Sequence, residues 1–163
     1  MKYLIGATLL AAMTVTASAQ EACAPFTVGT NDERIVVAHD SEPEGPSLGD
    51  VRLGERVLVD ADGTSVGTSR WTITLLDPDH GGDPSHLLVK SYAIFDSGVL
   101  ISEHILTQTV DGILTTDLTI ARESEGAVLG GTGVFANARG TMTLLLQGGG
   151  PIDLDYLYDI SCE

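Results

Sequence analysis

The stretch that decides the fold is AVLGGTGVFANARGTMTLLL, residues 127–146. It places a glycine-rich connection, Gly130–Ala138, between two apolar segments that favour β-structure. A phosphate-binding loop needs a helix directly after its glycines, because the helix N-terminal amides hold the anion. Here the following residues, Thr141–Leu146, are β-branched and leucine-rich, and the lysine of a P-loop is absent. The stretch therefore predicts a turn between two strands, with glycines at positive φ and Phe135 as an apolar plug.

The rest of the chain repeats this pattern of short β-prone segments separated by Gly, Asp and Pro. No long segment carries apolar residues at helical spacing, which indicates an all-β domain. Asp60–Gly63, Asp96–Gly98 and Asp111–Gly112 have the composition of hairpin turns. The expected strands are Arg34–His39, Val51–Val59, Ser69–Leu76, His86–Phe95, Val99–Thr107, Ile113–Ala121, Gly126–Leu129, Thr141–Gln147 and Ile152–Ile160.

Eight or nine antiparallel strands with little helix to cover their edges close into a barrel or fold into a sandwich. The expected strand Ser69–Leu76 alternates between a polar and an apolar face. Arg70, Thr72 and Thr74 lie on one face, and Trp71, Ile73 and Leu75 lie on the other. A small barrel with a partly polar lumen and a sandwich with one solvated face both fit this pattern.

Residues 1–19 have the form of a secretory signal peptide. Lys2 supplies the positive start, Tyr3–Val15 is an apolar run, and Ala17–Ala19 is a small-x-small cleavage site. The run is too short for a permanent transmembrane helix. We expect a single mature domain, residues 20–163, that is periplasmic or secreted from a bacterium, with no membrane anchor after signal cleavage.

The two cysteines suit an oxidising compartment. Cys23 lies near the start of the expected mature chain, and Cys162 is one residue from the end. We predict a disulfide between them that joins the two termini. No CxxC motif is present, so neither cysteine is predicted to be catalytic.

The chain is acidic, with a formal net charge of −15 at pH 7. Binding to nucleic acid or to an anionic membrane surface requires a positive footprint. The charge therefore speaks against both classes of partner.

Asp77–Asp83, together with His80 and His86, brings possible metal ligands close together in sequence. The segment lacks the ligand order of an EF-hand and the two-histidine spacing of a zinc site. It predicts a long exposed loop, and we expect no metal site. The GxSxG motif of serine hydrolases does not occur.

Three stretches together resemble one superfamily. Gly130–Phe135, followed by Ala138–Gly140, resembles the GGTGxFxxARG signature of plant dirigent proteins and the GGSGVF turn of allene oxide cyclases. Leu48–Gly67 resembles the LGD…L.D.DG..VG pattern of the same superfamily, and Val36–Asp40 resembles the strand ending in His-Asp that opens dirigent domains.

The resemblance implies an eight-stranded antiparallel β-barrel with a central apolar cavity, usually assembled as a trimer and without a metal or organic cofactor. Such barrels hold a hydrophobic small molecule and direct its ring closure or coupling. The chain departs from the family at Val134, where many dirigent proteins carry aspartate. The glutamate and asparagine on the first strand of the cyclases also have no clear counterpart.

The candidate catalytic residues are His39, Asp40, Glu103 and His104. His39 ends an expected strand and is a proton carrier near neutral pH if it faces the lumen, with Asp40 to orient it; the alternative is a solvated strand end. Glu103 and His104 are adjacent, so only one of them faces the lumen.

The candidate substrate-binding residues are Trp71, Tyr92, Arg139, Tyr156 and Tyr158. The tyrosines and Trp71 are either hydrogen-bond donors to a ligand or ordinary packing residues. Arg139 holds either a substrate carboxylate or a structural partner in the turn.

The leading hypothesis is an exported, cofactor-independent cyclase or isomerase, or a stereochemistry-directing protein, that acts on a hydrophobic substrate in the barrel. The alternative is a non-catalytic lipocalin-like carrier or a structural secreted barrel.

Overall fold

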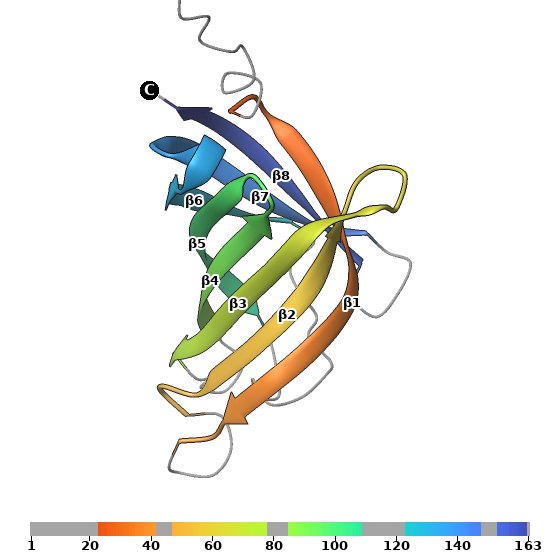
Figure 1. Cartoon of the computed structure of the whole chain (residues 1–163). Coiled ribbons are helices and arrows are strands. Elements are labelled where there is room, and N and C mark those ends of the chain that lie inside the picture. Colours follow the sequence, from red (N-terminus) through yellow and green to blue (C-terminus); the bar gives the residue numbers. More distant parts are fainter. Residues whose placement is uncertain (1–22, 42–46, 78–84, 109–122, 148–152, 163) are drawn as a thin grey trace, which may run out of the picture.

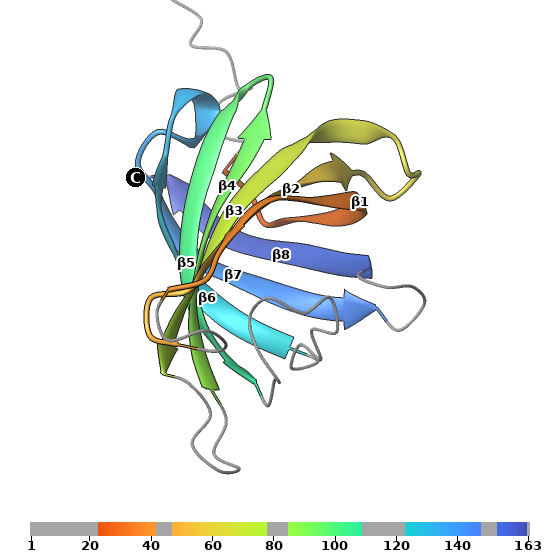
Figure 2. The same ribbon diagram turned by 90° about the horizontal axis from the view of Figure 1, so that it is seen from below.

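The computed structural model describes residues 23–41, 47–77, 85–108, 123–147 and 153–162. These residues form eight antiparallel strands and one short 3-10 helix, and β8 closes the ring by pairing with β1. The elements are β1 (Phe26–His39), β2 (Val51–Val59), β3 (Ser65–Asp77), β4 (Ser85–Phe95), β5 (Gly98–Gln108), β6 (Glu123–Gly131), η1 (Gly133–Phe135), β7 (Ala138–Gln147) and β8 (Asp153–Cys162). The closed barrel confirms the first of the two expected architectures and excludes the sandwich (Figure 1 and Figure 2).

The first strand is longer than the sequence predicted. It begins at Phe26 instead of Arg34, and its pairing with β2 shifts register between Asn31 and Glu33. This irregular, polar segment interrupts the β-prone pattern, which is why its first half was not predicted. The expected strand Ile113–Ala121 and the expected signal peptide lie outside the described residues.

The two ends of the barrel are connected differently. At one end the strands are joined by the short turns 60–64 and 96–97 and by the turn that contains η1. At the other end, each connection contains one of the segments outside the described residues, namely 42–46, 78–84, 109–122 and 148–152.

Aromatic rings fill the lumen at the short-turn end. Phe26 stacks on Tyr158 with ring centroids 4.9 Å apart, and Phe135 lies 5.5 Å from Phe95 and 6.1 Å from Phe26. Phe135 is buried, as predicted for a plug. A disulfide between Cys23 and Cys162 lies at the same end and confirms the predicted link between the termini.

The glycine-rich turn docks on the β4–β5 hairpin through its backbone. Thr132 N donates to Val99 O at 2.8 Å, and Val134 N donates to Ser97 O at 3.0 Å. Gly133 has a φ of 62°, and a Cβ atom placed there would overlap the carbonyl oxygen of Ser97. The motif is therefore a structural joint, because it permits both the positive φ and the close approach of two backbones.

We expect Gly133→Ala to be more destabilising than Gly63→Ala. Gly63 also has a positive φ, 78°, but a Cβ atom there meets nothing within 4 Å. Both variants carry the cost of the backbone conformation, whereas only Gly133→Ala adds steric overlap, which costs about 1–3 kcal/mol. Urea unfolding of the two variants measures this difference, and equal losses would refute the role given to the backbone contact.

The SLGD stretch, Ser47–Asp50, has a structural role at the start of β2. The carboxylate of Asp50 is buried and accepts hydrogen bonds from Ser41 N and Ser47 N, both at 2.8 Å, and from Ser47 Oγ at 3.0 Å. Burial acts to raise the pKa of Asp50, but these hydrogen bonds outweigh it and leave the pKa below its usual value. Asp50 thus holds Ser41 and Ser47 beside the start of β2.

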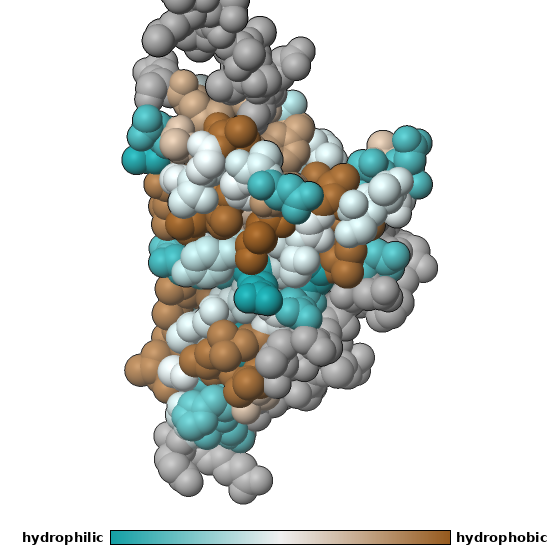
Figure 3. Space-filling model, viewed as in Figure 1, coloured by the Kyte–Doolittle hydropathy of each residue, from teal (hydrophilic) through white to brown (hydrophobic). Residues whose placement is uncertain are grey.

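The outer surface mixes polar residues with apolar patches (Figure 3). Val37 on β1 pairs with Leu53 on β2, and both side chains are exposed. The longest helix among the described residues has three residues, so none of these residues forms a helix that could cross a membrane.

Candidate functional site

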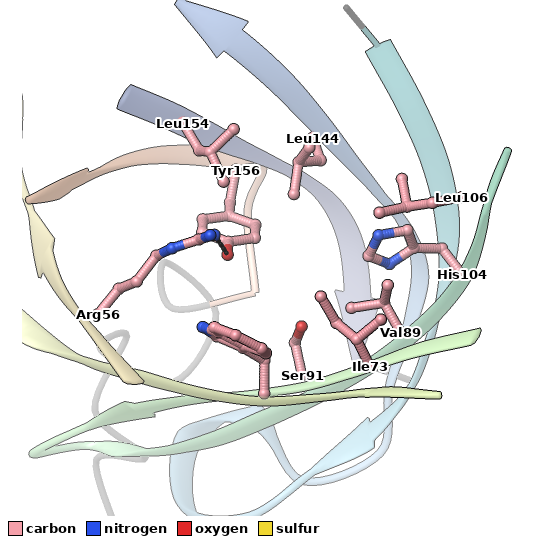
Figure 4. Close-up of a pocket in the computed structure, with 10 residues that line it drawn as sticks. Arg56, Ile73, Val89, Ser91, His104, Leu106, Leu144, Leu154 and Tyr156 are labelled. Atoms are coloured by element: carbon pink, nitrogen blue, oxygen red, sulfur yellow. Dashed lines mark hydrogen bonds between the residues drawn. The ribbon is translucent and has the colours of Figure 1, made fainter. Parts of the chain in front are cut away.

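The alternation of side chains along each strand directs one set of residues into the lumen. In the half of the barrel away from the short turns these residues line a cavity of about 20 Å³, which is room for about one water molecule. Its wall combines aliphatic and aromatic side chains with a few polar groups (Figure 4). The lining residues are Arg56, Trp71, Ile73, Val89, Ser91, His104, Leu106, Leu144, Leu154 and Tyr156.

Strand β2 contributes a buried arginine because its sequence pattern is inverted. In VRLGERVLV the more apolar set of alternate residues, which includes Leu53 and Val57, faces outward, while Arg52 and Arg56 are buried in the lumen. The guanidinium of Arg56 donates from Nη1 to the hydroxyl of Tyr156 at 3.2 Å. It also lies 5.4 Å from the ring centroid of Trp71, within range of a cation–π interaction. The sequence reasoning did not identify Arg56, since arginine in a β-strand usually faces solvent.

Gly54 makes room for the indole of Trp71. The two residues are partners in the β2–β3 register, and a Cβ atom at Gly54 would overlap the indole ring. The missing side chain therefore lets Trp71 lie flat across the lumen face of β2. This packing places its ring beside Arg56.

We expect Gly54→Ala to disturb the pocket without opening the barrel. The added methyl group forces the indole away from β2, at a cost of about 1–3 kcal/mol for overpacking. Trp71 is the only tryptophan of the chain, so its fluorescence spectrum reports this displacement directly. The far-ultraviolet circular dichroism of the variant should match that of the parent protein. An unchanged fluorescence spectrum would contradict the proposed contact.

His104 on β5 faces the lumen and is only 4% exposed. Burial lowers its pKa to about 4, because the charged imidazolium would lose its hydration. The imidazole is thus neutral at neutral pH, with one nitrogen that donates and one that accepts. Gly126 on β6 lies against the Cβ atom of His104 and leaves no space for a larger side chain there.

Buried polar side-chain atoms that have no hydrogen-bond partner among the described residues converge on this cavity. They include Trp71 Nε1, Ser91 Oγ and both ring nitrogens of His104. A buried polar group that makes no hydrogen bond costs about 1–3 kcal/mol. Within the described part of the chain, the side-chain atoms of this kind all belong to residues of this one cavity. Their grouping marks a place where a water molecule or a ligand supplies the missing partners.

The two lumen tyrosines have different surroundings. The hydroxyl of Tyr156 lines the cavity and accepts the hydrogen bond from Arg56. Tyr158 lies deeper, among the aromatic rings of the short-turn end. Burial, together with the nearby Tyr156, raises the pKa of Tyr158, so its phenol stays protonated.

The structure brings only some of the candidate residues together. Trp71, His104 and Tyr156 meet in the cavity, and Tyr158 is buried nearby. Of the adjacent pair, His104 faces inward and Glu103 faces outward, where its Oε2 lies 3.9 Å from Lys90 Nζ.

The remaining candidates lie away from the lumen. His39 and Asp40 are exposed at the end of β1. Tyr92 is half-buried on the outer face of β4. Arg139 is exposed, and its guanidinium donates to the carbonyl oxygen of the neighbouring Ala138. Arg139 thus makes a carbonyl contact within the turn, which was one of its two predicted roles.

Within the described ranges, no group of three or more His, Cys, Asp or Glu side chains is arranged to hold a metal ion. Most of the Asp77–Asp83 segment lies outside those ranges. At its start, His86 Nδ1 is 3.0 Å from Asp77 Oδ2, and both side chains are about half exposed.

No protein-family model and no curated protein matches the sequence. Solved structures do match the fold. Pyocyanin demethylase aligns with a TM-score of 0.62 and 18% identity, over 84% of this chain and 99% of that one. A pterocarpan synthase dirigent protein aligns with a TM-score of 0.56 and 17% identity, over 83% and 81%. A Diels-Alderase from Streptomyces koyangensis aligns with a TM-score of 0.54 and 17% identity, over 83% and 64%.

These matches define the class of fold. The chain has the closed eight-stranded barrel that the matched dirigent protein and Diels-Alderase also have, as its glycine turn and SLGD stretch predicted. At these identities the likeness concerns the fold alone.

Proposed function

We propose that the protein is an exported, cofactor-independent cyclase or isomerase, or a stereochemistry-directing protein, that acts on a hydrophobic small molecule inside the barrel. The observation that carries the proposal is the convergence of Trp71 Nε1, Ser91 Oγ and the nitrogens of His104 on one largely apolar cavity. Buried polar groups that make no hydrogen bond lower the stability of the folded protein. Their grouping around one cavity therefore favours a binding role, in which a ligand supplies the missing hydrogen bonds.

The arrangement fits a reaction controlled by confinement. Aliphatic residues such as Val89 and Leu144 exclude water, while neutral His104 offers both a proton donor and a proton acceptor. In a cyclisation or an isomerisation the molecular formula does not change, and a proton removed at one atom returns to another. A substrate that is held in one near-attack conformation gives one stereoisomer. The matched dirigent protein and Diels-Alderase support this class of activity by analogy.

A non-catalytic barrel, either a carrier or a structural secreted protein, is the second candidate. The cavity of about 20 Å³ favours the structural form, because any molecule of ordinary size, substrate or carried ligand, must displace side chains before it fits. The enzyme and the carrier differ in whether the bound molecule is released unchanged.

The test uses the conservation of molecular formula. The purified protein is incubated with small-molecule extracts of the organism that makes it, and the extracts are compared by mass spectrometry and chiral chromatography. We expect one compound to decrease while an isomer of equal mass, in one stereochemical form, increases. His104→Phe should abolish the change, whereas Glu103→Gln, on the outer face, should retain it. A compound that only co-purifies with the protein and stays unchanged would refute turnover and establish the carrier.

Export and assembly are part of the same proposal. The signal-like residues 1–19 and the disulfide between Cys23 and Cys162 support a periplasmic or secreted location. The exposed pair Val37 and Leu53, 47% and 38% exposed, supports burial of this face in a homotrimer. Light scattering of the purified protein measures the subunit number, and a Val37→Lys, Leu53→Lys variant should shift it to monomer.

A further inference from the structure

Two of the eight strand ladders are short among the described residues. Strand β5 pairs with β6 from Leu100 to Glu103, and β1 pairs with β8 from Phe26 to Gly29. By contrast, β4 and β5 pair along their whole length, as do β7 and β8. Both short ladders lie at the short-turn end of the barrel. Within the described ranges, backbone pairs therefore join the β6–β8 unit to strands β1–β5 at that end alone (Figure 2).

The short-turn end is held by several independent contacts. The Cys23–Cys162 disulfide ties the end of β8 to the residues before β1. The glycine turn after β6 is hydrogen-bonded to the β4–β5 hairpin, and Phe135 packs in the aromatic cluster. Past its last backbone pair, the β1–β8 ladder continues through a side chain. The hydroxyl of Thr30 donates to Leu154 O and accepts from Leu154 N, both at 3.1 Å. The β6–β8 unit is thus anchored firmly at one end and weakly at the other.

A β-bulge marks the point at which β6 bends. The partner of Ile101 on β5 is Gly130. The next residue of β5, Ser102, pairs with Val128, so Leu129 is an extra residue on β6. Such bulges interrupt a ladder and bend the strand that carries them. This bulge separates the anchored end of β6, beside the glycine turn, from the part of β6 that runs towards the cavity.

The β5–β6 ladder ends beside the cavity. Its last pair is Glu103 with Ala127. The residues that follow are His104 on β5 and Gly126 on β6. A Cβ atom at Gly126 would overlap the Cβ atom of His104, so the two backbones meet there without an intervening β6 side chain. None of the described residues that line the cavity belongs to β6. Separation of β5 from β6 at this point therefore leads directly to His104 and the cavity.

The small size of the cavity requires a movement of this kind. A volume of about 20 Å³ holds about one water molecule, so a larger ligand fits only after the lumen has widened. On the proposed function of the lumen, we propose that strands β6, β7 and β8 tilt outward as one unit about the short-turn end, and that the ligand enters through the side of the barrel between β5 and β6. Leu144 on β7 and Leu154 on β8 line the cavity and move outward with their strands. One hinge movement thus opens a path and enlarges the cavity.

Engineered disulfides test the movement. Glu103→Cys with Ala127→Cys joins β5 to β6 at the last pair of their ladder, beyond the bulge. Ala127→Cys with Thr141→Cys is the matched control, because these two residues are partners in the β6–β7 ladder, within the unit that moves. Directly paired residues of antiparallel strands have the Cα separation that a disulfide needs. Peptide mapping identifies the intended bond in each variant and checks that the bond between Cys23 and Cys162 is retained.

The buried indole N–H of Trp71 provides the measurement. Trp71 is the only tryptophan of the chain, so its hydrogen exchange is followed as one cross-peak in a proton–nitrogen correlation spectrum. We expect the bond between β5 and β6 to slow this exchange by about 10-fold or more and the control bond to change it by about twofold at most. Both bonds close loops of similar size, so they oppose global unfolding to a similar extent. Equal slowing in the two variants therefore assigns exchange to global unfolding and overturns the proposed movement.

Gly126→Ala tests the same movement in the opposite direction. The added methyl group overlaps His104 and pushes β6 away from β5, so indole exchange should be about 10-fold faster than in the parent protein. Gly140→Ala is the matched control, because a Cβ atom there overlaps the carbonyl oxygen of Asp159, within the β6–β8 unit. The two variants are compared at equal free energy of unfolding, adjusted with urea. The same exchange rate in both would contradict an opening between β5 and β6.

Binding of toluene separates the route of entry from the proposed function. Its association rate is measured from the indole cross-peak and from the methyl peaks of Leu144 and Leu154. We expect the β5–β6 disulfide variant to bind toluene about 10-fold more slowly than the control variant. Equal rates overturn entry through the side of the barrel and leave lumen binding intact. If toluene moves none of these peaks in the parent protein, the lumen does not take small molecules and the proposed function fails, while the exchange rates still decide whether the unit moves.

Discussion

Replacing Cys23 and Cys162 together by serine is expected to lower the free energy of unfolding by about 5 kcal/mol. The disulfide joins residues separated by 139 positions, so it closes nearly the whole described barrel into one covalent loop. In the chain-entropy account, the cross-link acts mainly on the unfolded chain, whose conformations it restricts. The size of the closed loop makes this the largest effect that we expect from any change of two residues.

Urea unfolding measures the loss. The parent protein in a reducing agent serves as a matched control, since it loses the same bond without a change of side chains. Its stability should agree with that of the double serine variant. If reduction costs less than about 1 kcal/mol, residual structure already restricts the unfolded chain, and the chain-entropy account does not apply here.

His104 is expected to make the protein sensitive to acid. Its pKa is about 4 in the folded protein and about 6.5 in an unfolded chain. Between these two values the unfolded chain binds a proton that the folded protein does not. The contribution of His104 to the free energy of unfolding is therefore greatest above about pH 6.5. It declines as the pH falls, by about 1.4 kcal/mol per pH unit and by about 3 kcal/mol in all.

The comparison with His104→Leu isolates this effect. We expect the parent protein to lose about 3 kcal/mol more than His104→Leu when free energies of unfolding are compared between about pH 7 and about pH 4. At neutral pH the leucine variant should be at least as stable as the parent, because it removes two buried nitrogens that have no hydrogen-bond partner among the described residues. His39→Gln is the control, since His39 is exposed. A parallel decline in the parent and in His104→Leu would show that other groups cause the acid sensitivity.

The fold was predictable from sequence because local signals agreed with one another. The hairpin turn Asp60–Gly63 and the glycine turn before β7 depend on residues that adopt unusual backbone conformations, and such residues are recognised directly in a sequence. The order of strands then follows from joining neighbours. The first half of β1 escaped prediction because polar residues and shifts of register interrupt it.

The site was only partly predictable, because the sequence did not show which face of each strand points into the lumen. Because adjacent residues of a strand point to opposite faces, the sequence required Glu103 and His104 to face opposite sides. It did not show which side was the lumen. On β2 the usual rule points the wrong way, since the more apolar set of alternate residues faces outward and Arg56 faces inward. Recognition of Arg56 required the closed ring, which places it against Tyr156, 100 residues away in the chain. Gly54 is likewise uninformative until Trp71 is seen to lie on it.

The difference between the two ends of the barrel has a consequence for how such a protein diversifies. The short turns, the ring cluster around Phe135 and the disulfide, which hold the barrel closed, all lie at one end. The cavity lies in the other half of the barrel, towards the ends of the strands that the remaining connections join. Connections accept insertions and substitutions more readily than the strands that they join. Related proteins can thus change their ligand specificity while they keep the same short-turn end. Protein design can change the ligand in the same way.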